Sequence, residues 1–206
     1  ITLVVAVHFV LVAHPSLPAR NVKELIALAK ARPGQITYAS SGAGGAPHLA
    51  GELFKRMAQV NLIHIPYKGS GPSFQDLLGG QVSLTFDSLV QSLPYIKSGR
   101  LRALAVLGNT RSPLAPEVPT VAESGVPGYE LTNWFGLVAP VAVPRAIIGK
   151  IHADVTQVLQ DAGVSERLSA MGATAVGNTP EQFGAAMRAD SEKWGRLIRE
   201  ANIRAE

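Results

Sequence analysis

The feature that most constrains the fold is a repeated strand-and-helix unit in the first half of the sequence. Short apolar runs typical of buried strands alternate with segments of helical spacing, at intervals of about twenty residues. Such an alternation predicts a parallel α/β layer with right-handed crossovers. The predicted strands cover residues 36–39, 62–66, 82–86 and 101–106.

Two long apolar runs stand on either side of this repeat. Ile1–Ala13 is rich in β-branched residues, so we expect one buried strand or two strands end to end. This run has no initiator Met and no basic leader, and it is shorter than the ~20 residues that a bilayer span needs. Tyr129–Pro140 is predicted as a second long strand, and residues 144–161 as a helix with one apolar face packed inward. Two long strands around an α/β layer indicate two crossings between lobes.

Composition narrows the classes of function. The chain has 206 residues, of which 47% are hydrophobic and 17% charged, which is enough for one sizeable core or two small ones. The absence of Cys excludes thiol nucleophiles and thiolate metal sites. The net charge is only +4, and acidic residues interleave with the basic ones, as in residues 188–204. Because no basic patch forms, no nucleic-acid partner is expected.

The loop Ser40-Ser41-Gly42-Ala43-Gly44-Gly45 is the most informative candidate site, because it follows a predicted strand and leads into a helix. Ligands in an open parallel sheet bind beyond the carboxyl ends of the strands. Glycines expose the backbone amides there, and the positive end of the helix dipole stands behind them. Ser40 and Ser41 add hydroxyl donors, and His48 in the first helical turn can donate to an anion. The sequence therefore predicts an anion site; the alternative is a purely structural connection.

A small carboxylate fits this loop better than a nucleotide does. The pattern Gly42-x-Gly44 lacks the third glycine of a dinucleotide fingerprint, because Pro47 stands in its place. The next predicted strand ends without an acid for a ribose, and no GxxxxGK[ST] motif occurs. We therefore expect no nucleotide cofactor.

Asp87 and an aromatic pair are further candidates for ligand contact. Asp87 ends a predicted strand, where it can receive an ammonium or hydroxyl group of a ligand. The alternative is that Asp87 or Ser88 only caps the next helix. Trp134 and Phe135 lie in the second long strand and either close over a ligand or belong to the core.

No catalytic or metal-binding constellation is recognisable in the sequence. There is no GxSxG elbow and no HExxH spacing, and acidic residues are sparse in the predicted strand-end loops apart from Asp87. We therefore expect no catalytic residues and no metal site, and we interpret His64 and the other histidines apart from His48 as structural. This balance of anion donors without a nucleophile and base favours binding over turnover.

An ordered series of motifs extends over nearly the whole chain and resembles the Bug family of periplasmic solute receptors. The series comprises YASSGAGGAPHLAGELFKRMA, HIPYKGSGPSFQDLLGGQV, FDSL, LPYIKSGRLRALAV, PEVPTVAESGVPGYE and WFGLVAP. Members of that family are the extracytoplasmic binding proteins of tripartite tricarboxylate transporters. The resemblance implies a type II periplasmic binding protein fold, with two α/β lobes joined by two crossing strands.

The resemblance also implies a division of the chain and a ligand site. It places lobe 2 at residues 9–133 and a remnant of lobe 1 at residues 1–8 and 134–206, with the first part of lobe 1 missing. Residues 41–45 with His48 match the loop that holds one ligand carboxylate in the family, and Asp87 matches its strand-end acid. Many members carry a hydroxyl residue or Asn where this chain has Ala43, Gly45 and Ala46, so backbone groups must supply most of the donors here.

The function expected from the resemblance is that of a non-enzymatic, periplasmic receptor. It binds a dicarboxylate, tricarboxylate, acidic amino acid or aromatic acid between its lobes and delivers it to membrane permease subunits, without a cofactor and without entering the membrane. Two alternatives stay open. One is a truncated chain that binds nothing and associates through exposed apolar faces. The other is an enzyme that uses Asp87 and His48 as acid and base on a bound carboxylic acid.

Overall fold

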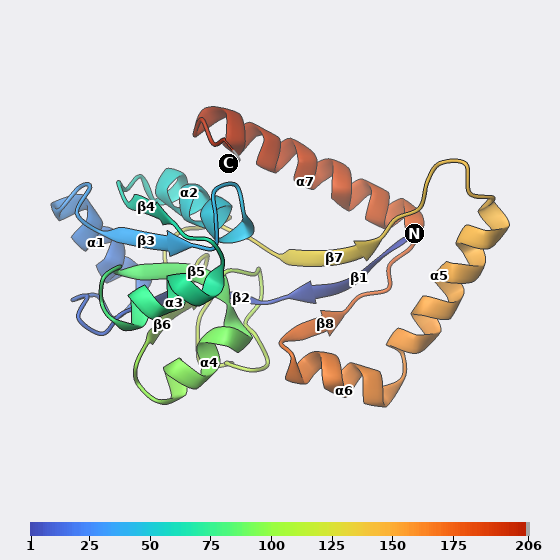
Figure 1. Ribbon diagram of the computed structural model, residues 1–206, viewed down its shortest axis with the longest axis horizontal. Helices are drawn as coiled ribbons and strands as arrows, with labels where there is room; N and C mark the ends of the chain where they lie inside the picture. Colours follow the sequence, from blue (N-terminus) through green and yellow to red (C-terminus); the bar gives the residue numbers. More distant parts are fainter. Residues whose placement is uncertain (205–206) are drawn as a thin grey trace. The chain divides into compact units, whose positions relative to one another are not determined.

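A computed structural model describes residues 1–204, and the chain divides into two compact units (Figure 1). Unit 1 comprises Ile1–Val7 and Thr132–Gly195. Unit 2 comprises His8–Leu131 together with the chain from Arg196 onward. The two units are described separately below, and the lobe boundaries expected from the sequence remain a prediction.

Unit 2 is built on a five-stranded sheet with the strand order β4-β3-β5-β2-β6. Strand β3 pairs in parallel with both β4 and β5, whereas β2 pairs antiparallel with β5 and β6. The predicted α/β layer is therefore confirmed, with β2 as its one antiparallel member. In chain order the elements are β2 (Phe9–Ala13), α1 (Val22–Ala31), β3 (Thr37–Ser40), α2 (Ala46–Ala58), β4 (Ile63–Pro66), α3 (Ser70–Leu78), β5 (Leu84–Ser88), α4 (Leu89–Lys97) and β6 (Arg102–Val106).

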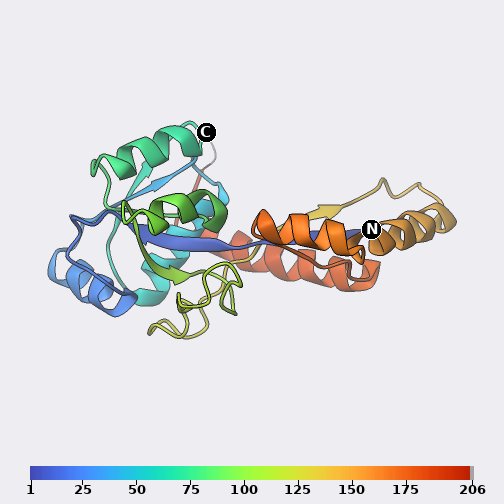
Figure 2. The same ribbon diagram turned by 90° about the horizontal axis from the view of Figure 1, so that it is seen from below.

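Helices cover both faces of this sheet. Figure 2 shows α3 and α4 on one side of it and α1 and α2 on the other. Alternate residues along each strand point to opposite faces, and the buried cluster on the α3 and α4 side includes Val10, Val12 and Ala39. On the α2 side, the Phe86 ring packs against Phe54 at a centroid distance of 5.6 Å. The sheet of unit 2 is thus buried on both faces, as expected for parallel strands.

The first helix of unit 2 begins at a capping box that the sequence encodes locally. The Asn21 side chain accepts a hydrogen bond from the Glu24 amide at 2.9 Å. The Glu24 carboxylate in turn accepts from the Arg20 amide at 2.7 Å. One amide of the first turn of α1 and the amide of the residue before its N-cap are satisfied in this way, which fixes where α1 begins.

Unit 1 contains a three-stranded antiparallel sheet with the order β7-β1-β8. Its main buried aromatic side chain is Phe183, whose ring meets Trp134 edge to face at 5.3 Å. Trp134 Nε1 donates to Asp190 at 2.6 Å. The elements are β1 (Thr2–Val7), β7 (Asn133–Leu137), α5 (Arg145–Leu159), α6 (Ala162–Ala170), β8 (Ala173–Ala175) and α7 (Pro180–Glu200), whose last residues belong to unit 2.

The structure corrects two predictions about these elements and confirms a third. The opening run forms two strands end to end, β1 and β2. The strand predicted over residues 129–140 is wrong in length, because only Asn133–Leu137 is extended in a sheet. Tyr129 instead anchors a loop, donating its hydroxyl to the Ala50 carbonyl at 3.0 Å. The inward face predicted for residues 144–161 is covered only in part: Ile148, Ile151 and Val155 are half-buried, whereas Ile147 and Val158 are exposed, and α5 has no fully buried residue.

Among the described residues, no helix combines the length and the apolar character that crossing a membrane requires. The longest helix, α7, spans 21 residues. Its sequence carries charged side chains throughout, among them Arg188, Asp190 and Lys193.

Candidate functional site

The candidate site lies at one edge of the sheet of unit 2, where several loops meet. Strands β3, β4 and β5 run in the same direction, so their carboxyl ends share this edge. The register places Ser40 opposite Pro66 at the ends of β3 and β4. The predicted loop of residues 41–45 and Asp87 at the end of β5 therefore come from neighbouring strands.

The glycine-rich loop is tied to the loop that follows β4. The Tyr67 amide donates to the Ser40 carbonyl at 3.0 Å, and the Gly69 amide donates to the Ser41 carbonyl at 2.9 Å. Gly44 has a φ of +78°, a left-handed conformation that favours glycine, whereas Gly45 has an ordinary φ of −71°. These backbone hydrogen bonds hold the two loops side by side at the edge of the sheet.

The hydrogen bonds of the loop show which of its amides remain available. The Gly44 amide donates to His48 Nδ1 at 2.9 Å, and the Gly45 amide donates to the Gly42 carbonyl at 3.4 Å. Within the described part of the chain, the amides of Ala43, Ala46 and His48 have no such acceptor.

The amides of Ala46 and His48 lie in the first turn of a helix of thirteen residues, and that of Ala43 lies in the loop before it. Helix α2 has Gly45 as its N-cap, and no side chain caps it. The partial positive charge of a helix N-terminus is therefore left for an external acceptor. A carboxylate supplies two acceptor oxygens, and the loop offers backbone donors for them.

His48 is buried and serves the loop as a hydrogen-bond acceptor. Its exposed fraction is 7%, and its Nδ1 atom faces the Gly44 amide. Its Nε2 atom lies 3.9 Å from the Glu52 carboxylate. Both ring nitrogens thus face protein groups, so the geometry shows the His48 ring supporting the loop. A contact between the His48 side chain and a ligand remains a prediction.

Ser40 and His64 form a second support beneath the loop. The Ser40 hydroxyl lies 2.6 Å from His64 Nε2 and donates to the Gly42 carbonyl at 3.0 Å. The rings of His48 and His64 are stacked at 3.7 Å, with 9° between their planes. The sequence analysis treats His64 as structural but does not place it at this loop, since only the register of β3 with β4 brings it next to Ser40 and Tyr38.

Asp87 is held at the end of β5 in a buried position. Its exposed fraction is 4%, its Oδ1 atom accepts from the Ser88 amide at 2.7 Å, and its Oδ2 atom has no partner among the described residues. Burial raises the pKa of Asp87, and the hydrogen bond from the Ser88 amide partly offsets this rise. Ser88 is the N-cap of α4, yet no side chain caps that helix. The capping alternative therefore does not describe this carboxylate.

Trp134 and Phe135 lie in β7 of unit 1. Trp134 is half-buried against Phe183 and bonded to Asp190, which makes it a packing residue of that unit. Phe135 is 59% exposed. A ligand contact for either residue remains a prediction.

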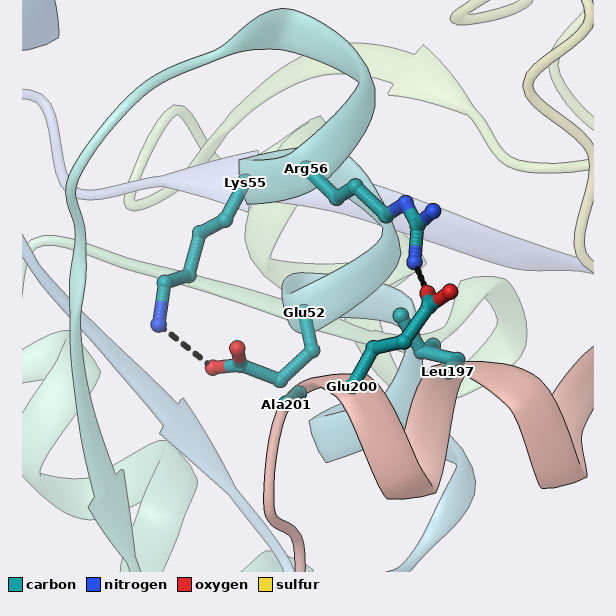
Figure 3. Close-up of a pocket in the computed structure, with 6 residues that line it drawn as sticks. All are labelled: Glu52, Lys55, Arg56, Leu197, Glu200 and Ala201. Atoms are coloured by element: carbon teal, nitrogen blue, oxygen red, sulfur yellow. Dashed lines mark hydrogen bonds and ion pairs between the residues drawn. The ribbon is translucent and has the colours of Figure 1, made fainter.

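A separate cavity of about 470 Å³ lies between α2 and the end of α7 within unit 2 (Figure 3). Its basic side chains are already paired: Lys55 Nζ lies 2.7 Å from Glu52 Oε1, and Arg56 pairs with Glu200. None of the glycine-loop residues lines it. Because each cation there is answered by a carboxylate, this cavity is a poorer anion site than the glycine loop.

The residues described hold no group of three or more His, Asp or Glu side chains arranged to hold a metal ion. The donors at the edge of the sheet are instead backbone amides and hydroxyl groups.

The family comparison identifies the kind of protein to which the chain belongs. A family model described as the tripartite tricarboxylate transporter family receptor (TctC) matches residues 1–203. This chain belongs to that family. The predicted resemblance is confirmed, and so is the fold class, since solved TctC and Bug proteins share the mixed α/β fold with high structural similarity.

Several relatives of this TctC-family chain are close in sequence or structure. Protein BugT of Bordetella pertussis is 38% identical over 204 residues, which are 99% of this chain and 63% of BugT. Rpa4515 of R. palustris, solved with adipate, is 36% identical with a TM-score of 0.86, over 98% of this chain and 67% of that one. MatC of Rhodopseudomonas palustris, solved with bound malate, is 27% identical with a TM-score of 0.79, over 95% of this chain and 68% of that one.

The TctC-family chain is shorter than these relatives. It spans 56% of the length of a Pseudomonas protein encoded in a tcbD-tcbE intergenic region, to which it is 36% identical over 187 residues, or 90% of this chain.

Proposed function

We propose that this chain is a solute receptor that binds a small carboxylate at the glycine-rich loop of unit 2. The observation that carries the proposal is the start of α2, where the amides of Ala43, Ala46 and His48 have no acceptor within the described residues. Those donors lie at or next to a helix N-terminus that no side chain caps, which suits an anion of the size of a carboxylate.

The ligands of two relatives support this class of ligand. Adipate is bound in the solved Rpa4515 structure and malate in that of MatC, and both are dicarboxylates. We propose the same broad class for this chain: a dicarboxylate, tricarboxylate, acidic amino acid or aromatic acid.

The family supports the remaining parts of the proposal. The matched family is described as receptors of tripartite tricarboxylate transporters. The resemblance to the Bug receptors implies that such a receptor works outside the cytoplasmic membrane and delivers its ligand unchanged to permease subunits. We therefore propose a periplasmic, non-enzymatic protein whose partners are a carboxylate and those subunits. The site geometry supports binding over catalysis, since Asp87 Oδ2 is buried and His48 Nδ1 is bonded to Gly44.

The test is calorimetric titration of the purified chain with malate, adipate, citrate, aspartate and benzoate. The variant Gly45→Val probes the loop, because the φ of Gly45 is ordinary and an added Cβ meets only contacts of 3.5 Å or more. Gly45→Val is therefore expected to fold, while its side chain displaces a carboxylate from the amides. The matched control is Gly149→Val in α5, where an added Cβ meets nothing within 4 Å.

The expected result is saturable binding of at least one acid, unchanged in Gly149→Val and weakened at least tenfold in Gly45→Val. A tenfold loss corresponds to about 1.4 kcal/mol, which is close to the contribution of one hydrogen bond to a charged group. If no acid binds, the receptor proposal is wrong for this chain. If Gly45→Val binds as well as the parent chain, the ligand does not lie on this loop.

A further inference from the structure

The histidine pair beneath the glycine loop has a single arrangement of protons that fits its contacts. His48 Nδ1 accepts a hydrogen bond from the Gly44 amide at 2.9 Å. A ring nitrogen that accepts from an N–H group cannot carry a proton itself. The His48 ring is therefore neutral when this bond is made, and its proton lies on Nε2, which faces the Glu52 carboxylate at 3.9 Å.

A proton on Nδ1 opposes the position of the loop. The added N–H group would point at the N–H group of Gly44, so the 2.9 Å bond would become a contact between two donors. Gly44 is also the residue with the left-handed φ of +78°, at which the loop changes direction toward α2. Loss of this bond releases the loop at the residue directly before the N-cap of α2.

The neighbours of His48 set the balance between the neutral and the protonated form of its ring. From β4, His64 stacks on it at 3.7 Å, so a positive charge on one ring disfavours a positive charge on the other. On α2 itself, Glu52 favours the protonated form and Lys55 disfavours it. Glu52 is shared, since it accepts from the Tyr38 hydroxyl at 2.7 Å and from Lys55 at 2.7 Å.

The end of α7 brings one further ion pair to this part of unit 2. Arg56 of α2 pairs with Glu200 of α7, so neither of these two charges is left free to act on the rings.

We propose that neutral His48 is the positioning residue of the glycine loop, and that protonation of its ring frees Gly44 and weakens carboxylate binding. This inference rests on the proposed function and adds that carboxylate binding depends on pH. The chain binds its ligand near neutral pH and releases it on acidification. The His48 ring acts through the Gly44 amide, without touching the ligand.

The energetics of burial agree with this assignment. Burial lowers the pKa of His48, and it lowers that of His64 to about 4, with the His48 charge adding to the effect. Both rings are therefore neutral near pH 7, where the loop is held.

The test compares two substitutions with the parent chain, using the acid with the highest affinity from the titrations. In His48→Asn the side-chain carbonyl takes the place of Nδ1 as an acceptor that does not titrate over this range. His48→Leu removes the acceptor. Each protein is titrated from about pH 7 down to about pH 4, and the ratio of the Kd of the parent chain to that of His48→Asn is plotted, which cancels the titration of the ligand itself.

The expected ratio is flat near neutral pH and rises toward tenfold per pH unit below the pKa of His48, because only the neutral form binds. His48→Leu is expected to bind at least tenfold more weakly than the parent chain near pH 7, with His48→Asn close to the parent. A ratio that stays flat throughout, or a His48→Leu variant that binds normally, overturns the inference and leaves the receptor proposal intact.

A second measurement does not depend on any ligand. The nitrogen NMR signals of His48 are expected to show a proton on Nε2 and none on Nδ1 near pH 7. The Gly44 amide signal is expected to move with the titration of the same ring. A proton on Nδ1 at neutral pH contradicts the positioning role even if the His48→Leu variant fails to fold.

Discussion

The two units of this chain differ in how much of their apolar surface they cover. In unit 2 every residue of β2 is buried, and its sheet has helices on both faces. In unit 1 the described buried apolar side chains are Leu3, Ala173 and Phe183, and neither α5 nor α6 has a buried residue. Unit 2, which carries the candidate site, therefore provides its own core, whereas unit 1 depends largely on strand pairing and one aromatic cluster.

The difference shows that an amphipathic pattern does not guarantee a packed face. Helix α2 buries Leu53 and Phe54 against its sheet. Helix α5 carries apolar residues at similar spacing, yet Ile147 is 50% and Val158 is 56% exposed. A periodic pattern predicts a helix with one apolar side. Whether that side is covered depends on the elements opposite it.

Removing a core ring gives the largest effect in this comparison. Phe54→Ala is expected to cost about 3 to 5 kcal/mol of unfolding free energy, because Phe54 is fully buried between Phe86 and Tyr129. The matched variant Phe135→Ala in unit 1 removes a ring that is 59% exposed and is expected to cost about 0.5 kcal/mol or less.

Urea unfolding can separate these effects by unit. The chain has four Tyr residues and two Trp residues. All four Tyr residues belong to unit 2, and Trp134 and Trp194 both belong to unit 1. In Phe54→Ala, the urea midpoint followed by the tyrosine near-ultraviolet circular dichroism signal is expected to fall. In Phe135→Ala, the urea midpoint followed by tryptophan emission is expected to change little. Equal losses in the two variants would contradict the contrast between the units.

Adding one methyl group to a helix is expected to act in opposite directions in the two units. A Cβ at Gly51 of α2 overlaps the ring of Tyr38, so Gly51→Ala is expected to destabilise unit 2 by about 1 to 3 kcal/mol. Gly149 in α5 has nothing within 4 Å of an added Cβ, so Gly149→Ala is expected to stabilise its helix by about 1 kcal/mol. Thermal unfolding of the two variants measures both changes in stability. If Gly51→Ala left the stability unchanged, α2 would be loosely packed against Tyr38.

Acid is expected to weaken unit 2 by a smaller amount. The pKa of His64 is lowered to about 4 in the folded chain from 6.5, and those of His8 and His48 are also lowered by burial. Between these values the unfolded chain binds more protons, so stability falls as the pH drops from about 6.5 toward 4. Asp87 acts in the opposite direction, because its pKa is raised and its protonation favours the fold.

The His64→Gln variant isolates the largest of these contributions. The urea midpoint of the tyrosine signal is expected to fall less steeply between about pH 6.5 and pH 4 in His64→Gln than in the parent chain. Parallel slopes in the two proteins would show that His64 does not titrate with folding.

The features that sequence reasoning recovered are local in the chain. The strand-and-helix repeat and the capping box at Asn21 and Glu24 depend on residues a few positions apart, so pattern alone predicts them. The glycine loop is predicted for the same reason, as a turn between a strand and a helix.

The features that sequence reasoning missed depend on register and on neighbours distant in the chain. The stack of His48 on His64 exists because β3 and β4 pair with Tyr38 opposite His64, which no spacing reveals. Likewise, Tyr129 reads as part of a strand, but its hydroxyl bonds the Ala50 carbonyl and holds the segment in a loop.

The position of β2 in its sheet has a consequence for synthesis on the ribosome. Val10 pairs with Asp87 on one side and with Val106 on the other. Residue 106 is made 96 residues after residue 10, since 106 − 10 = 96, which takes roughly 5 to 20 seconds at cellular rates of elongation. During that time a strand that ends fully buried is exposed on the growing chain. The nascent protein is therefore expected to need a chaperone on this segment until β6 has emerged.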